Sequence, residues 1–215
     1  MKNKLSEIVK SIFSSEKFPT RAFVIYTLLV LLLSILSMPI NEKVTAIMMQ
    51  DMQLDPVQKE MAMNMSSKMG PITMVFSVVG SLVGILACSL FVYLTSKIIH
   101  ADISFNHCSL LCLAVFIILL INDYIAVGVN FIQGIENIHS IKDTCCTSIG
   151  YVFNLSDNTY FSKILLIINP FTFIAFAFFS YCLNLLFKVK ASTAVYTSLA
   201  FFCIYILFQA SLLNI

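Results

Sequence analysis

The apolar residues of this chain fall into five long runs separated by short polar segments. Each run has about 19–25 residues and contains no Asp, Glu, Lys or Arg; the runs are Ala22–Ile40, Ile72–Ser96, Ile103–Ile121, Ile164–Phe187 and Ala191–Ile215. About 20 apolar helical residues suffice to cross a hydrocarbon core of about 30 Å. Backbone polar groups in lipid must be satisfied within their own segment, so each run is predicted to be a helix.

The predicted fold class is therefore all-α: a polytopic integral membrane protein built as a bundle of five transmembrane helices. We expect a single membrane domain over residues 1–215. Its polar head covers residues 1–21, and its spans lie at about 22–40, 72–96, 103–126, 164–187 and 191–213. Composition agrees, because hydrophobic residues make up 59% and charged residues 11% of the chain, against roughly 45–50% and 25% in soluble domains.

The distribution of basic residues predicts the orientation. The head and the turns after the second and fourth spans share one side of the membrane, which carries Lys2, Lys4, Lys10, Lys17, Arg21, Lys97, Lys188 and Lys190. The other side carries Lys43, Lys59, Lys68, Lys142 and Lys163. Basic residues favour the cytoplasmic side. We therefore expect a cytoplasmic N-terminus and an outer C-terminus, most simply in a bacterial cytoplasmic membrane.

The head has a helical pattern of its own. Apolar residues recur at i, i+3, i+4, i+7 and i+8, which are the positions Leu5, Ile8, Val9, Ile12 and Phe13. This period is typical of an amphipathic helix. Ile8, Ile12 and Phe13 are predicted to lie at the membrane interface. The alternative is a helix that covers the bundle without touching lipid.

A second helix is predicted within the first outer loop. Asp55-Pro56 has the pattern of an N-cap followed by Pro at the first helical position. That helix is expected to stop near Gly70-Pro71, with Pro71 opening the second span. The loop from Asn130 to Ser162 is expected to be mostly irregular, because it carries the turn-formers Gly134, Gly150, Asn154, Asp157 and Asn158.

Methionines in the first outer loop raise the question of copper. Met61, Met63 and Met65 alternate in a way that resembles extracytoplasmic copper motifs, and thioethers suit Cu(I). Met61, Met65 and Met69, however, have the i, i+4 spacing of one helical stripe, and Met stripes commonly pack against neighbours. No His lies in this loop. We expect packing, with no metal and no cofactor.

Other reactive side chains do not assemble into a predicted active site. Cys145-Cys146 is a vicinal pair, which is expected to stay reduced or to bond between molecules, because a disulfide between adjacent residues is strained. Asp123 lies near the outer end of the third span, where an interfacial anchor and an ion-handling role are the alternatives. No Ser/His/Asp set, metalloprotease motif or phosphate-binding loop is present, so a non-enzymatic protein is expected.

Helix-packing signals are clearer. Gly80 and Gly84 form a GxxxG motif, extended by Ser77 and Ala87. Small residues at this spacing let helices approach closely, either within the bundle or in a homo-oligomer. Asn169-Pro170 is expected to kink the fourth span or to mark its true start.

Two short motifs resemble those of the Yip-one (Ypt-interacting protein) domain family. Pro19 and Phe23 before the first span, and Asn169-Pro170-Phe171 in the fourth, look like that family's Pro…Phe and Asn-Pro-Phe entries. The resemblance covers nearly the whole chain and implies five spans with no catalytic residues. Its eukaryotic members bind Rab-type GTPases through a long cytoplasmic head. The short head here resembles bacterial members, some of which assist ABC-type exporters.

The expected function is that of a scaffold or accessory in a membrane export or trafficking complex. The expected partners are the lipid bilayer and other integral membrane proteins, with ABC-type exporter subunits and a second copy as candidates. A net charge of +2 does not favour nucleic acid. The alternative is a small transporter or metal-handling protein that uses the Met-rich loop.

Overall fold

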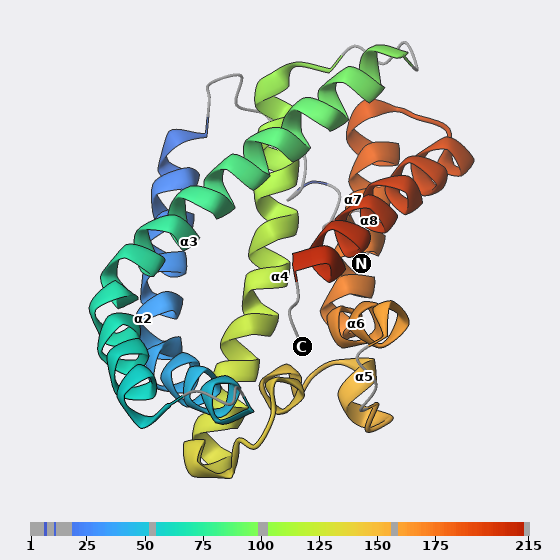
Figure 1. Cartoon of the computed structure of the whole chain (residues 1–215). Coiled ribbons are helices and arrows are strands. Elements are labelled where there is room, and N and C mark those ends of the chain that lie inside the picture. Colours follow the sequence, from blue (N-terminus) through green and yellow to red (C-terminus); the bar gives the residue numbers. More distant parts are fainter. Residues whose placement is uncertain are drawn as a thin grey trace. The chain divides into compact units, whose positions relative to one another are not determined.

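The computed structural model describes residues 19–51, 55–98, 103–155 and 159–212, together with Glu7 and Ser11. All regular secondary structure in these residues is helical (Figure 1). Five of the helices are long and apolar enough to cross a membrane. The all-α fold class is confirmed, and the chain is a multi-pass integral membrane protein.

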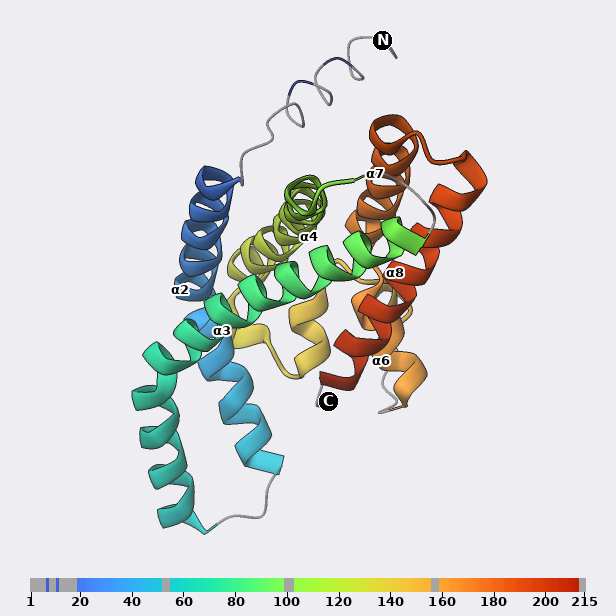
Figure 2. The same ribbon diagram turned by 90° about the horizontal axis from the view of Figure 1, so that it is seen from above.

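The first two long helices extend well beyond their apolar runs. Helix α2 covers Thr20–Asp51 and continues through Pro39. Helix α3 covers Pro56–Ile98 as one continuous helix of 43 residues (Figure 2). The prediction that the loop helix stops at Gly70-Pro71 is therefore wrong, whereas the segment apolar enough to cross a membrane, Gly70–Ile98, begins near the predicted start of the second span at Pro71. Proline within a membrane helix is tolerated because neighbouring groups can satisfy the backbone carbonyl that it leaves free. The predicted start at Pro56 is confirmed.

Helix α4 covers Phe105–Gln133 and ends at Gly134. The backbone of Gly134 has φ +89°, a conformation in which a side chain would be strained. Short elements follow: the 3₁₀ helices η1 (Ile135–Asn137) and η2 (Ile141–Cys145), then α5 (Ile149–Val152). The loop expected to be irregular is thus broken up as predicted, but it contains more helical turns than the sequence indicated.

The fourth apolar run is divided between two helices. Helix α6 covers Tyr160–Ile167 and α7 covers Pro170–Phe187, so the expectation that Asn169-Pro170 marks the true start of the span is confirmed. Pro suits the first turn of a helix, where its missing N–H costs nothing. Helix α8 (Ala191–Leu212) follows a tight turn in which Lys188 takes a positive φ of 52°. The Asn184 amide holds this turn by donating to the Val189 carbonyl at 2.9 Å.

The described chain forms two compact units. Unit 1 draws on Met1–Leu28, Gly80–Leu120 and Phe171–Tyr205, and unit 2 on Leu29–Val79, Ile121–Pro170 and Ile206–Ile215. The core of unit 1 is aromatic. Phe179 of α7 is fully buried and stacks on Phe201 of α8 with ring centroids 4.9 Å apart. Phe202 meets Phe176, Phe179 and Tyr205 at steep angles. Such ring pairs contribute about 0.5–1.5 kcal/mol beyond their buried area.

Unit 2 has a more polar interior. Asn122, Asn130, Ser148, Ser162 and Asn169 are all buried. Asn130 ties η2 to α4, because its amide donates to the carbonyls of Ala126 at 2.8 Å and Thr144 at 3.4 Å. The Tyr124 hydroxyl donates to the Leu29 carbonyl at 2.6 Å and so links α4 to α2. Side-chain hydrogen bonds therefore tie η2 to α4 and α4 to α2.

Candidate functional site

Helices α2 and α3 run antiparallel against each other within unit 2. The hydroxyl oxygens of Ser34 and Ser77 lie 3.4 Å apart. Met38, one turn after Ser34 in α2, approaches Gly70, which precedes Ser77 in α3: a Cβ built at Gly70 would lie 3.0 Å from the terminal methyl of Met38. The two helices therefore run in opposite directions. The absence of a side chain at Gly70 allows Met38 to approach the helix backbone.

A cleft of about 420 Å³ opens between these two helices. Its polar lining consists of Ser34, Ser37, Asn41, Glu42, Thr45, Thr73 and Ser77. Met38, Val44, Gly70 and Met74 complete it. Ser34, Ser37, Thr73 and Ser77 lie inside the two apolar runs, where polar groups are costly in lipid. Sequence periodicity does not indicate this site, because its polar residues lie on two helices and are separated along the chain by up to 43 positions.

Three hydroxyls that line the cleft from α2 donate their hydrogens to backbone carbonyls of their own helix. Ser34 donates to the Val30 carbonyl at 2.9 Å, Ser37 to the Ser34 carbonyl at 3.1 Å, and Thr45 to the Asn41 carbonyl at 2.8 Å. The Asn41 amide nitrogen approaches the Ser37 hydroxyl at 3.4 Å. The oxygen lone pairs that remain on Ser34, Ser37 and Thr45 are available as hydrogen-bond acceptors. Glu42, the one ionisable residue in the lining, adds a carboxylate.

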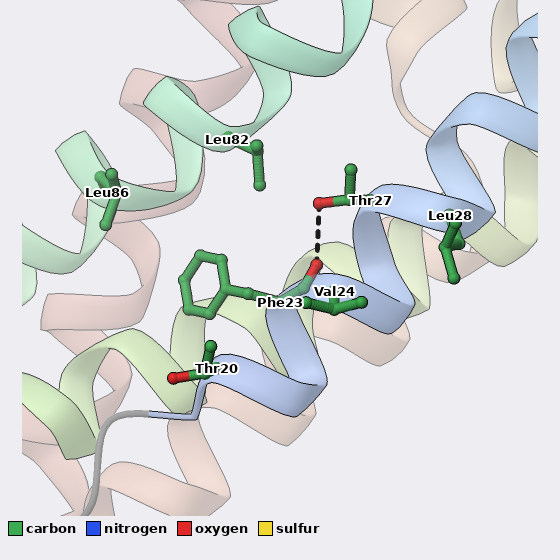
Figure 3. A pocket seen from close by; sticks show the side chains of 7 residues that line it. All are labelled: Thr20, Phe23, Val24, Thr27, Leu28, Leu82 and Leu86. Atoms are coloured by element: carbon green, nitrogen blue, oxygen red, sulfur yellow. Dashed lines mark hydrogen bonds between the residues drawn. The ribbon is translucent and has the colours of Figure 1, made fainter.

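A second, apolar pocket lies in unit 1, between the first part of α2 and the middle of α3 (Figure 3). Phe23 and Leu28 line it from α2, and Leu82 and Leu86 from α3. The Thr27 hydroxyl donates to the Phe23 carbonyl at 2.8 Å. This pocket offers lipid-like packing and no reactive group.

The residues singled out for their resemblance to the Yip-one domain family lie at helix starts. The Phe23 N–H donates to the Pro19 carbonyl at 3.0 Å, which closes the first turn of α2. The Asn169 side chain is buried and donates to the Ile167 carbonyl at 3.0 Å. Pro170 and Phe171 open α7. These positions shape helix entry, and the resemblance itself stays a prediction.

The GxxxG motif does not mediate a close contact within the chain. A Cβ built at Gly80 or at Gly84 meets no atom of the described residues within 4 Å. The expectation of close packing inside the bundle is therefore not met in this structure. Ala87, on the same face of α3, is also exposed. This face is open to lipid or to another protein.

Asp123 and its neighbours occupy the last turns of α4. The Asp123 side chain is exposed, and Asn122 donates to its carboxylate at 3.4 Å. Asn122 is itself buried, and its carbonyl oxygen has no hydrogen-bond partner among the described residues. The choice between an interfacial anchor and an ion-handling role for Asp123 stays a prediction.

The vicinal cysteines lie beside this end of α4 and are both free. Cys146 contacts the Ala126 carbonyl with its sulfur at 3.7 Å. Burial raises the pKa of the Cys145 thiol; a hydrogen bond with Thr144 lowers it in part, and the neighbouring Cys146 and Asp123 raise it. Burial also raises the pKa of Cys146. Both thiols therefore hold their protons more strongly than an exposed cysteine.

A Ser–His contact lies at the start of α4 and was missed from the sequence. The Ser104 hydroxyl and the His107 ring nitrogen Nδ1 are 2.6 Å apart. Ser104 also accepts the backbone N–H of His107 at 3.4 Å, as an N-cap residue does. Helix capping explains the Ser104–His107 contact. A Ser three residues before His is the spacing of an N-cap, so the sequence pattern could have indicated this contact.

Metal-ligand candidates do not converge in the part of the chain that the structure describes, since no group of three His, Cys, Asp or Glu is placed to hold an ion. Met61 lies on α3 and is 68% exposed. Ile8, Ile12 and Phe13 lie outside the described residues. No family model, curated protein or solved structure matches this chain.

Proposed function

We propose that this chain is a non-enzymatic membrane protein that acts through helix contacts with other integral membrane proteins, as a scaffold or accessory in an export or trafficking complex. The observation that carries the proposal is the open face of α3. Gly80 and Gly84 have the spacing that lets two helices approach closely, yet no described residue uses it. A face of this kind suits a helix from another chain.

The proposal includes a location and an orientation. The basic residues of the head support a cytoplasmic N-terminus and an outer C-terminus in a bacterial cytoplasmic membrane. Exporter subunits and a second copy of this chain are the candidate partners. The resemblance to the Yip-one domain family supports this class of function over catalysis.

A transporter is the alternative, and the broken fourth span bears on it. Transporters often place unwound backbone against a substrate. Here the Ile167 carbonyl accepts from Asn169 and the Ile168 carbonyl accepts from the Ile149 N–H at 2.9 Å. The polar groups of the break are thus used inside the protein, which favours a structural role for it.

The test is crosslinking from the open face in native membranes. A photoreactive amino acid at Ala87 is expected to form adducts with another integral membrane protein or a second copy. Gly84→Leu should abolish these adducts, because its side chain would fill the space that a partner helix needs. The control is Val75→Leu, since Val75 is 62% exposed and the helical period places it on the opposite face of α3 from Gly80 and Gly84.

Gly84→Leu should leave the folding of the monomer unchanged, because a Cβ at position 84 meets no described residue within 4 Å. Adducts that persist equally in Gly84→Leu and Val75→Leu would contradict the proposal. Adducts to lipid alone, together with solute movement by purified protein in liposomes, would contradict the scaffold function and support the transporter function instead.

A further inference from the structure

The cleft between α2 and α3 in unit 2 has the chemistry of a binding site that the proposed function does not use. We propose that it binds the ammonium group of an amphiphile, with Glu42 as the counter-ion and the hydroxyl oxygens of Ser34 and Ser37 as acceptors.

The cleft suits a ligand that donates hydrogen bonds and carries positive charge. The hydroxyls of Ser34 and Ser37 donate their hydrogens to backbone carbonyls of their own helix. Their remaining lone pairs can accept hydrogen bonds from a ligand in the cleft. The Glu42 carboxylate has no hydrogen bond or ion pair with any described residue and carries the only formal charge in the lining. A ligand that supplies N–H donors and positive charge complements this arrangement, whereas an anion would meet like charge and like lone pairs.

The cleft extends along both helices from the apolar run of α2 to its polar end. From Ser34 to Thr45 the cleft follows α2 for about 11 residues, or roughly 16 Å at 1.5 Å per residue. Ser34 lies inside the apolar run that ends at Ile40, whereas Glu42 lies just past its end. One end of the cleft therefore lies at the depth of the hydrocarbon core, and the other end lies at the membrane–water interface. A molecule with a polar head and an apolar chain matches that gradient better than a free hydrated ion.

The cleft also has an apolar lining. Met38 and Met74 contribute flexible thioether side chains from the two facing helices. Methionine adapts to irregular apolar shapes, so these residues suit an alkyl chain without demanding one geometry. A volume of about 420 Å³ accommodates an amine with the first part of its chain.

Two sources could supply such an ammonium amphiphile: an aminophospholipid of the bilayer, or a single-chain alkylamine that enters from outside. The test uses full-length protein in maltoside micelles and a dodecylammonium probe that carries a photoreactive diazirine. We expect saturable labelling of α2 or α3 within residues 29–79, competed by dodecylamine. Added competition by phosphatidylethanolamine assigns the lipid source; its absence assigns the single-chain amine.

Glu42→Gln should weaken probe binding at least tenfold, and Ser37→Val should weaken it severalfold. Glu136→Gln is the control, because Glu136 is an exposed carboxylate of unit 2 that does not line the cleft. Equal thermal midpoints for the three variants establish that each is folded. Labelling that is unchanged in Glu42→Gln, or that dodecyl sulfate and phosphatidylglycerol compete as well as dodecylamine, would overturn the proposal.

Discussion

Gly150 packs directly against the backbone of Leu166, so that a Cβ built at Gly150 would lie 2.9 Å from the Leu166 nitrogen. The same Cβ would be 3.0 Å from two side-chain carbons of Leu166. No real Cβ contact with backbone is normally this short, so α5 approaches α6 this closely only because position 150 has no side chain. The nearby hydrogen bond from the Ile149 N–H to the Ile168 carbonyl depends on the same approach.

Gly150→Ala is therefore expected to destabilise the protein. Overpacking of a tight contact typically costs about 1–3 kcal/mol. The measurement is the thermal midpoint in one detergent. Gly128→Ala is the matched control, because a Cβ there meets nothing within 4 Å among the described residues. Alanine is favoured over glycine in a helix by up to about 1 kcal/mol, so the control should be neutral or stabilising. Equal losses in both variants would refute the close approach.

Tyr160→Phe tests the link between α6 and α8. The Tyr160 hydroxyl donates to the Leu207 carbonyl at 2.8 Å. Its loss should cost about 1 kcal/mol or less, because Tyr160 is 48% exposed and hydrogen bonds between membrane helices contribute modestly. We expect faster hydrogen exchange in residues 204–212.

The control for this link is Tyr196→Phe. Tyr196 is 70% exposed, and its hydroxyl bonds to no described residue. A change of exchange in residues 204–212 that is equally large in the two variants would show that the Tyr160 hydroxyl contributes nothing specific.

An impermeant thiol reagent tests the proposed orientation. Applied to intact cells, it should label Cys145 or Cys146 and fail on a variant in which both are Ser. Only the thiolate reacts, and burial raises the pKa of both thiols. The fraction of thiolate at neutral pH is accordingly lower than in an unfolded chain. The labelling rate should keep rising with pH beyond about 8.5, where an ordinary thiol begins to level off.

Labelling that appears only after the membrane is permeabilised would reverse the orientation. A labelling rate that levels off at the same pH in folded and denatured protein would show that burial does not govern these thiols.

Replacing Met61, Met63 and Met65 together by Leu tests the choice between packing and copper. All three lie on α3, where Met61 and Met65 are one helical turn apart. Leu keeps apolarity and nearly keeps volume, so each exchange should cost about 1 kcal/mol at most. Thermal stability and growth on copper should not change. Stoichiometric Cu(I) binding by the natural chain that disappears in the triple variant would establish a copper site.

The sequence by itself determined the helices and several of their ends. Charge-free runs longer than the bilayer core leave the backbone no alternative to helix, so five spans could be predicted. Pro170 and Ala191 begin helices where the sequence indicated, and Gly134 and Asn154 adopt positive φ in the predicted loop. These features depend on local chemistry, which sequence contains in full.

The tertiary structure decided what those helices do with their polar and small residues. Gly70-Pro71 reads locally as a stop, yet α3 continues through it, and Gly70 receives the Met38 side chain of α2. Ser34 and Ser77 become neighbours although 43 residues separate them. Gly80 and Gly84 remain open although their spacing suits a close contact. Which helix faces which, and in what register, is set by packing between distant segments, and periodicity within one segment does not contain that information.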